Sequence, residues 1–170
     1  TTPIHIKALA DRLKGRKPNL IKADLTGKTY FSSGKSWTAV GKGEMVKMLG
    51  ERINPNALKA IKEDVKGYGT AAIRKEAIDQ SDSGATMLDV NVGLGTIDES
   101  VMMKKAVMAV ENVVTLPLSI DTTDITALEE GLKVCSGKPL VNSVTGKEES
   151  LKAVLPLVKK YGAAVLGLTI

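Results

Sequence analysis

Three apolar runs of strand length end in short polar side chains, and this feature constrains the fold more than any other. Leu116–Asp121 ends in an isolated carboxylate before a helical pattern, and Met87–Asn91 and Leu140–Ser143 repeat the arrangement. In a parallel α/β sheet or barrel, the carboxyl ends of the strands and the loops after them line the ligand-binding crevice. We therefore expect the polar ends of these three strands to meet at one rim.

The sequence after residue 44 alternates between strand and helix patterns. Two more strands are expected at Val46–Ile53 and Ala164–Ile170. Helices are expected up to Lys66, at 70–83, 98–113 and 124–135, and up to Tyr161. Apolar strands joined by helices predict right-handed βαβ units on a parallel sheet that is buried on both faces. Pro156 should either kink the last helix or delay its start.

Residues 1–44 form a basic N-terminal extension to an α/β domain at 45–170. The extension contains nine Lys or Arg and three acidic residues, a net charge of +6, whereas the remaining residues carry −1. A short helix is expected over Thr1–Arg16, followed by a hairpin or an irregular segment over Asn19–Trp37. A basic arm could bind nucleic acid, but no known motif frames its aromatic residues. We expect it to pack on the barrel or to touch a partner protein.

The composition excludes several kinds of chemistry. His5 is the only histidine and lies near the N-terminus, which argues against a His-rich zinc site and a Ser-His-Asp triad within these residues, and no metal is expected. Cys135 is the only cysteine, so no internal disulfide can form and the cytoplasm is the expected compartment. No apolar run approaches the roughly 20 residues that span a bilayer, so no membrane contact is expected.

Five strand-end sequences carry a resemblance to a known family. They are Gly50–Asn54, Leu88–Gly93, Ser119–Thr122, Val141–Ser143 and Gly162–Thr169. In order and spacing they resemble the pterin-binding barrel of the methyltetrahydrofolate:corrinoid-protein methyltransferases. Cobalamin-dependent methionine synthase has a similar folate domain. Dihydropteroate synthase is a more distant relative, whose Asn-Val-Thr-Pro-Asp signature the first strand lacks.

The resemblance implies an α/β enzyme with a (β/α)8 TIM barrel, of which these residues supply the first five strands. The enzyme would transfer the methyl group from N5 of methyltetrahydrofolate to a Co(I) corrinoid carried by a partner protein. The family's residues near N5 lie on later strands, so the catalytic residues are unknown and expected outside this sequence. The barrel would be completed by a continuation of the chain or by another chain in a homo-oligomer.

The pterin-binding residues that the resemblance implies lie at the strand ends. A pterin ring presents an edge of N–H donors, which a carboxylate accepts in a bidentate manner, and an amide side chain both donates and accepts. The implied residues are Asp121, Asn142, Asp89 and Asn91, with Asn54 and Ser143 as further candidates.

Other roles and other functions stay open. Asp89 could cap a turn, Asn54 and Asn91 could be ordinary loop residues, and Glu51 could form an ion pair with Arg52. The chain could also be a non-catalytic module that binds a pterin or docks a corrinoid protein. A further alternative is a relative of dihydropteroate synthase, which would use p-aminobenzoate and a pterin pyrophosphate.

Overall fold

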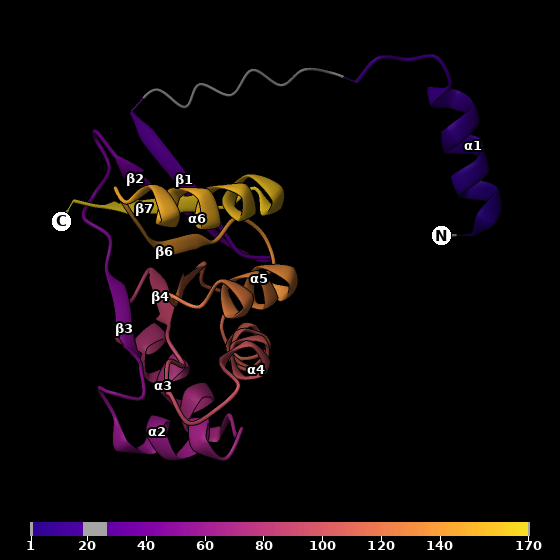
Figure 1. Cartoon of the computed structure of the whole chain (residues 1–170). Coiled ribbons are helices and arrows are strands. Elements are labelled where there is room, and N and C mark those ends of the chain that lie inside the picture. Colours follow the sequence, from indigo (N-terminus) through magenta and orange to yellow (C-terminus); the bar gives the residue numbers. More distant parts are fainter. Residues whose placement is uncertain (1, 19–26, 170) are drawn as a thin grey trace.

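The computed structural model describes residues 2–18 and 27–169 (Figure 1). One helix comes first, and a two-stranded hairpin and a five-stranded sheet with its helices follow. The elements are α1 (Pro3–Leu13), β1 (Lys28–Ser32), β2 (Trp37–Gly41), β3 (Leu49–Ile53), α2 (Lys59–Lys66), α3 (Ala71–Asp82), β4 (Met87–Val90), α4 (Glu99–Glu111), β5 (Leu118–Asp121), α5 (Ile125–Val134), β6 (Leu140–Thr145), α6 (Glu148–Tyr161) and β7 (Ala164–Leu168).

Strands β3 to β7 form one parallel sheet in the order of the sequence. The predicted α/β class of the TIM-barrel type is confirmed, and the five strands form an open part of such a barrel. The first strand begins at Leu49, later than the predicted Val46. Its partner β4 begins at Met87, opposite Leu49, and Val46 is 99% exposed outside the ladder.

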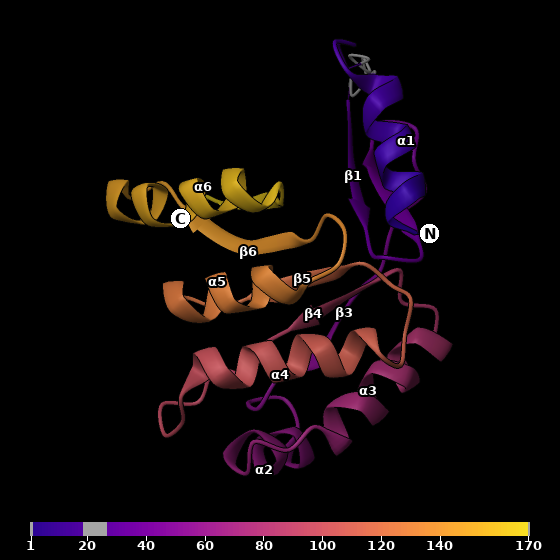
Figure 2. The same ribbon diagram turned by 90° about the vertical axis from the view of Figure 1, so that its right-hand side faces the viewer.

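Helices α3 to α6 cover one face of the sheet, as Figures 1 and 2 show. The apolar side chains that alternate along the strands pack against these helices. They are fully or almost fully buried and include Leu88, Val90, Leu118, Ile120 and Val141. Because successive side chains of a strand point to opposite faces, Asp89 and Ser119 lie on the face that the helices leave free.

Side-chain caps fix the start of the two helices that follow β4 and β5. Asp98 Oδ1 accepts the backbone N–H groups of Ser100 and Val101 at 3.0 and 3.3 Å. Asp124 Oδ1 makes the equivalent contacts at the start of α5, at 2.7 and 3.0 Å. These bonds satisfy N–H groups that a helix start leaves unpaired, and they also fix where the loops after the two strands end.

Helix α6 runs through Pro156 from its start at Glu148, so the expectation of a later start is wrong. Proline lacks the N–H whose usual acceptor would be the carbonyl of Lys152, and its ring crowds that carbonyl. Both residues are exposed, so water can bind that carbonyl, while Val154 is buried against the core.

No helix within residues 2–18 and 27–169 has both the length and the apolar character needed to cross a membrane.

The antiparallel hairpin of β1 and β2 is hydrogen-bonded to the end of the sheet that lies opposite the polar strand ends. Ser32 and Lys138, which precedes β6, exchange backbone hydrogen bonds at 3.0 and 2.9 Å. Ser33 Oγ donates to the carbonyl oxygen of Thr115, before β5, at 2.6 Å. In Figure 2 the hairpin lies at the right and β6 runs away from it to the left. Of the predicted hairpin segment, residues 19–26 lie outside the described residues.

Candidate functional site

Two acid–amide pairs lie at the carboxyl ends of β4, β5 and β6. Asn91 Nδ2 donates to Asp121 Oδ2 at 2.8 Å, and Asn142 Nδ2 donates to Asp89 Oδ1 at 3.3 Å. Asp121 and Asn142 are also neighbours in the β5–β6 ladder. The structure therefore brings together the four strand-end residues that the sequence singled out.

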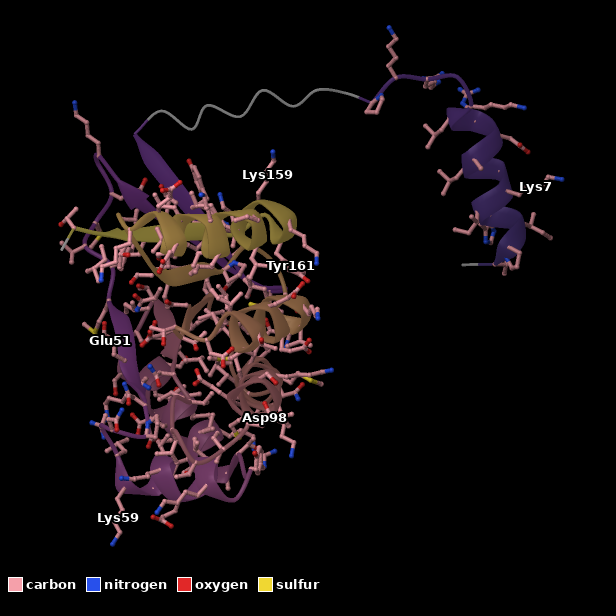
Figure 3. The ribbon with its side chains drawn as sticks, viewed as in Figure 1. Lys7, Glu51, Lys59, Asp98, Lys159 and Tyr161 are labelled. Atoms are coloured by element: carbon pink, nitrogen blue, oxygen red, sulfur yellow. The ribbon has the colours of Figure 1, made fainter. Side chains whose placement is uncertain are left out.

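These pairs lie on the face of the sheet that points away from the helices. Asp89 alternates with Leu88 and Val90, which are both buried under the helices. Glu51 of β3 also points away from α4 and α5 (Figure 3), and its negative charge acts on Asp89. The face thus gathers three carboxylates and two amides. Such an acceptor-rich surface suits a ligand that presents N–H donors.

Burial raises the pKa of Asp89 from 3.8 to about 6. The residue is 3% exposed, and loss of hydration disfavours the charged carboxylate. The side chains of Ser119 and Asn142 oppose this shift, whereas the charges of Asp121 and Glu51 add to it. Asp89 therefore keeps a proton to a higher pH than an exposed aspartate does.

We expect Asp89 to make the folded state less stable as the pH rises from about 4 to about 6. In this window the unfolded chain releases the proton of Asp89 while the folded protein retains it, so the free energy of unfolding falls. The raised pKa corresponds to a total decrease of roughly 3 kcal/mol in the free energy of unfolding, complete above about pH 7.

The control is Asp89→Asn, which removes the titrating group and keeps the shape of the side chain. Urea unfolding gives the free energy of unfolding of both proteins between about pH 4 and about pH 7. As the pH rises, the unsubstituted protein should lose roughly 3 kcal/mol more than the variant does. A stability difference that does not change with pH would contradict a raised pKa for Asp89.

The two further candidates are placed differently from the four central residues. Asn54 Oδ1 accepts the backbone N–H of Asn56 at 2.8 Å, which is the geometry of a local turn after β3. Ser143 follows Asn142 on β6, through a cis peptide bond, and is half-buried. Ser143 is therefore covalently adjacent to Asn142, whereas Asn54 follows Ile53, whose carbonyl oxygen accepts the backbone N–H of Asn91 at 3.0 Å.

Arg52 does not form the ion pair with Glu51 that the sequence left open as an alternative. Arg52 Nε instead lies 2.8 Å from Oε1 of Glu76 on α3. Adjacent residues of a strand point to opposite faces of the sheet. Arg52 shares the α3 side with Gly50, where an added Cβ would clash with Gln80, and Glu51 points to the other face.

A cavity of about 410 Å³ lies beside β3 and α3, away from the acid–amide pairs. Its lining includes Gly50, Glu51, Arg52, Glu76 and Gln80, and none of the four residues of the acid–amide pairs. Arg52 pairs with Glu76 there, and Gln80 Oε1 accepts the backbone N–H of Arg52 at 3.2 Å, so these three residues already bond one another. We therefore place the candidate site at the strand ends and not in this cavity.

Three polar residues of the site were not identified from the sequence. Ser119, beside Asp89 in the β4–β5 ladder, is 0% exposed, and its hydroxyl lies near enough to the Asp89 carboxylate to affect its pKa, although it makes no hydrogen bond of good geometry among the described residues. Thr122 and Glu99 form a side-chain hydrogen bond just beyond Asp121. In the part of the chain that the structure describes, no group of three or more His, Cys, Asp or Glu side chains is placed to hold a metal ion.

Comparisons with known proteins cover the same residues. A family model described as pterin binding enzyme matches residues 50–170, which contain β4 to β7 and both acid–amide pairs. Methionine synthase of Mycobacterium leprae (strain TN) is 32% identical over 178 residues, a match that covers 100% of this chain and 15% of that protein. The chain thus spans a small part of the length of this relative, and the match includes the N-terminal residues that the family model leaves out.

Proposed function

The chain belongs to the family of pterin-binding enzymes, and from this membership we propose that its strand-end site binds methyltetrahydrofolate for transfer of the N5 methyl group to a corrinoid on a partner protein. The match to methionine synthase supports a role in folate-dependent methyl transfer. The observation that carries the proposal is the placement of two acid–amide pairs on one face of the sheet.

The acid–amide pairs have the donors and acceptors that a pterin edge requires. Asn91 uses Oδ2 of Asp121, so Oδ1 is available for an N–H group of the ligand. A carboxylate has about four lone-pair sites, so it can accept two parallel N–H groups without giving up Asn91. The Asn142 amide donates to Asp89, and its oxygen remains an acceptor. The hydroxyl of Ser119, beside Asp89, adds a buried polar group to the same face.

Methyl transfer from N5 requires help at the nitrogen, because a tertiary amine is a poor leaving group unless it is protonated or hydrogen-bonded as the bond breaks. The corrinoid would supply the nucleophilic cobalt. The residues of this chain would bind and orient the ring, and Asp89 would hold a proton within the site near pH 6. The groups that act on N5 are proposed to lie outside the described strands.

The open face of the sheet supports the proposal that further polypeptide completes the site. Leu166 and Leu168 of β7 are 45% and 41% exposed, and they alternate with Val165, which packs toward the helices. Apolar side chains on the inner face of a barrel are normally covered by the opposite strands. A continuation of the chain or a second chain would cover them.

Cys135 is a free thiol, which fits the proposed cytoplasmic location.

The test begins with a calorimetric titration of the full-length protein with 5-methyltetrahydrofolate. A corrinoid protein reduced to Co(I) is then added, and its visible absorption is followed. We expect saturable pterin binding and conversion of the corrinoid to its methylated form. Binding without transfer would support the non-catalytic module. Condensation of p-aminobenzoate with a pterin pyrophosphate would instead support a relation to dihydropteroate synthase, and absence of pterin binding would refute the proposal.

A further inference from the structure

A side-chain hydrogen bond joins the segments that directly follow Asn91 and Asp121. The hydroxyl of Thr122, directly after Asp121, donates to Oε1 of Glu99, the first residue of α4. Thr122 is 8% exposed, so the bond forms largely away from competing water. It connects the loop between β4 and α4 with the loop between β5 and α5.

A further hydrogen bond orients the Thr122 hydroxyl, and Glu99 lies beside the turn that holds Asn91. Thr122 Oγ1 accepts the backbone N–H of Asp124 at 3.0 Å, which leaves the hydroxyl hydrogen for Glu99. On the other loop, the backbone N–H of Gly93 donates to Asn91 Oδ1 at 2.9 Å. A Cβ added at Gly93 would lie 3.9 Å from Glu99 Oε2. The Glu99 carboxylate therefore lies beside the turn that orients the Asn91 amide.

We propose that Glu99 and Thr122 are positioning residues for the pterin site. Their bond holds the two loops in the relative position in which Asn91 Nδ2 reaches Asp121 Oδ2 at 2.8 Å. This inference rests on the proposed function, since Asn91 and Asp121 are the residues proposed to bind the pterin. Glu99 and Thr122 act on the ligand through that pair.

A purely structural role makes different predictions. A carboxylate in the first turn of a helix stabilises the helix through its dipole, and Thr122 could serve only to start α5. Thr122→Val keeps the size of the side chain and removes its hydrogen bonds, whereas Thr122→Ser retains them. Glu99→Ala removes the acceptor, whereas Glu99→Gln keeps an acceptor oxygen and removes the charge that the helix dipole favours.

The experiment measures the affinity of the full-length protein for 5-methyltetrahydrofolate by calorimetric titration, together with the thermal unfolding temperature. Thr122→Val and Glu99→Ala should each weaken binding about tenfold, the effect of one net hydrogen bond. Thr122→Ser and Glu99→Gln should stay within about threefold. The double variant Thr122→Val/Glu99→Ala should lose no more than either single variant, because both substitutions remove the same bond.

Ser100→Ala is the matched control for helix stability. The Ser100 hydroxyl donates to Asp98 Oδ1 at 2.6 Å at the start of the same helix, and this bond stays within α4 and its cap. This variant should bind the pterin as the unsubstituted protein does, with at most a lower unfolding temperature.

Several outcomes would overturn the inference. One is normal affinity in Thr122→Val and Glu99→Ala. Another is a loss of affinity in the double variant equal to the sum of the two single losses. A third is a loss of affinity in Ser100→Ala as large as that in Glu99→Ala, because helix stability would then set the affinity. If the unsubstituted protein binds no pterin, the proposed function fails and this inference fails with it. The two kinds of failure are therefore distinguishable.

Discussion

Asp121→Ala should weaken the binding of methyltetrahydrofolate to the full-length protein by about 2–4 kcal/mol. This loss corresponds to a factor between about 30 and nearly a thousand in the dissociation constant. The reason is that the substitution leaves two sets of donors unpaired, the ligand's N–H groups and the amide of Asn91, which donates to Asp121 at 2.8 Å. Calorimetric titration measures the effect directly.

Asp121→Asn is the control for side-chain shape. The amide has the same size as the carboxylate, but its NH2 group would face the N–H groups of Asn91 or of the ligand. We expect a loss in the same range as for alanine. Unchanged affinity in both variants, with a circular dichroism spectrum like that of the unsubstituted protein, would remove Asp121 from the site.

Ile120→Ala should lower the free energy of unfolding of the sheet region by about 2–5 kcal/mol. Ile120 is 0% exposed in the middle of β5 and packs beneath α5, where a Cβ added to Gly131 would lie 3.2 Å from its Cγ2. Alanine would leave a cavity at this helix–sheet contact, and the surrounding side chains can fill it only in part. Ile120→Val, which removes a single methylene, should cost about 0.5–1.5 kcal/mol.

Hydrogen–deuterium exchange in the peptides of β4, β5 and β6 is the appropriate measurement, because it reports the opening of this sheet alone. The protected amides should exchange at least about thirtyfold faster in Ile120→Ala. Ile125→Ala, at a residue 38% exposed at the start of α5, is the comparison and should change exchange little. Equal effects of the two variants would show that Ile120 is not part of the stabilising core.

Much of the fold could be predicted because the apolar runs are bounded by residues that start or end helices. Asp98 caps a helix, as its place before an apolar stripe suggests, and Gly162, with a φ of +66°, ends α6. The start of β3 could not be predicted in this way. Val46 is apolar and could by itself belong to a strand. The ladder between β3 and β4 begins only at Leu49, which lies opposite Met87 of β4.

The meeting of the strand ends could also be predicted, because parallel strands bring their carboxyl ends to one edge. Which acid pairs with which amide could not. Asn142 bonds Asp89, two strands away, and not Asp121, its neighbour in the ladder. That choice depends on the stagger of the strands and on the reach of each side chain. Glu99 could not be recognised as a site residue from the sequence, because the helix dipole alone explains an acidic residue at a helix start.

The attachment of the hairpin has a consequence for fluorescence spectroscopy. Trp37, the only tryptophan of this sequence, lies on β2, where it is 70% exposed and its ring centroid is 6.0 Å from that of Tyr30. Its emission therefore reports on the hairpin and on the bonds that join Ser32 and Ser33 to the far end of the sheet. A pterin bound at the carboxyl ends of the strands should leave this emission unchanged. A shift in the wavelength of maximum emission on titration would mean that the ligand alters the hairpin across the length of the sheet.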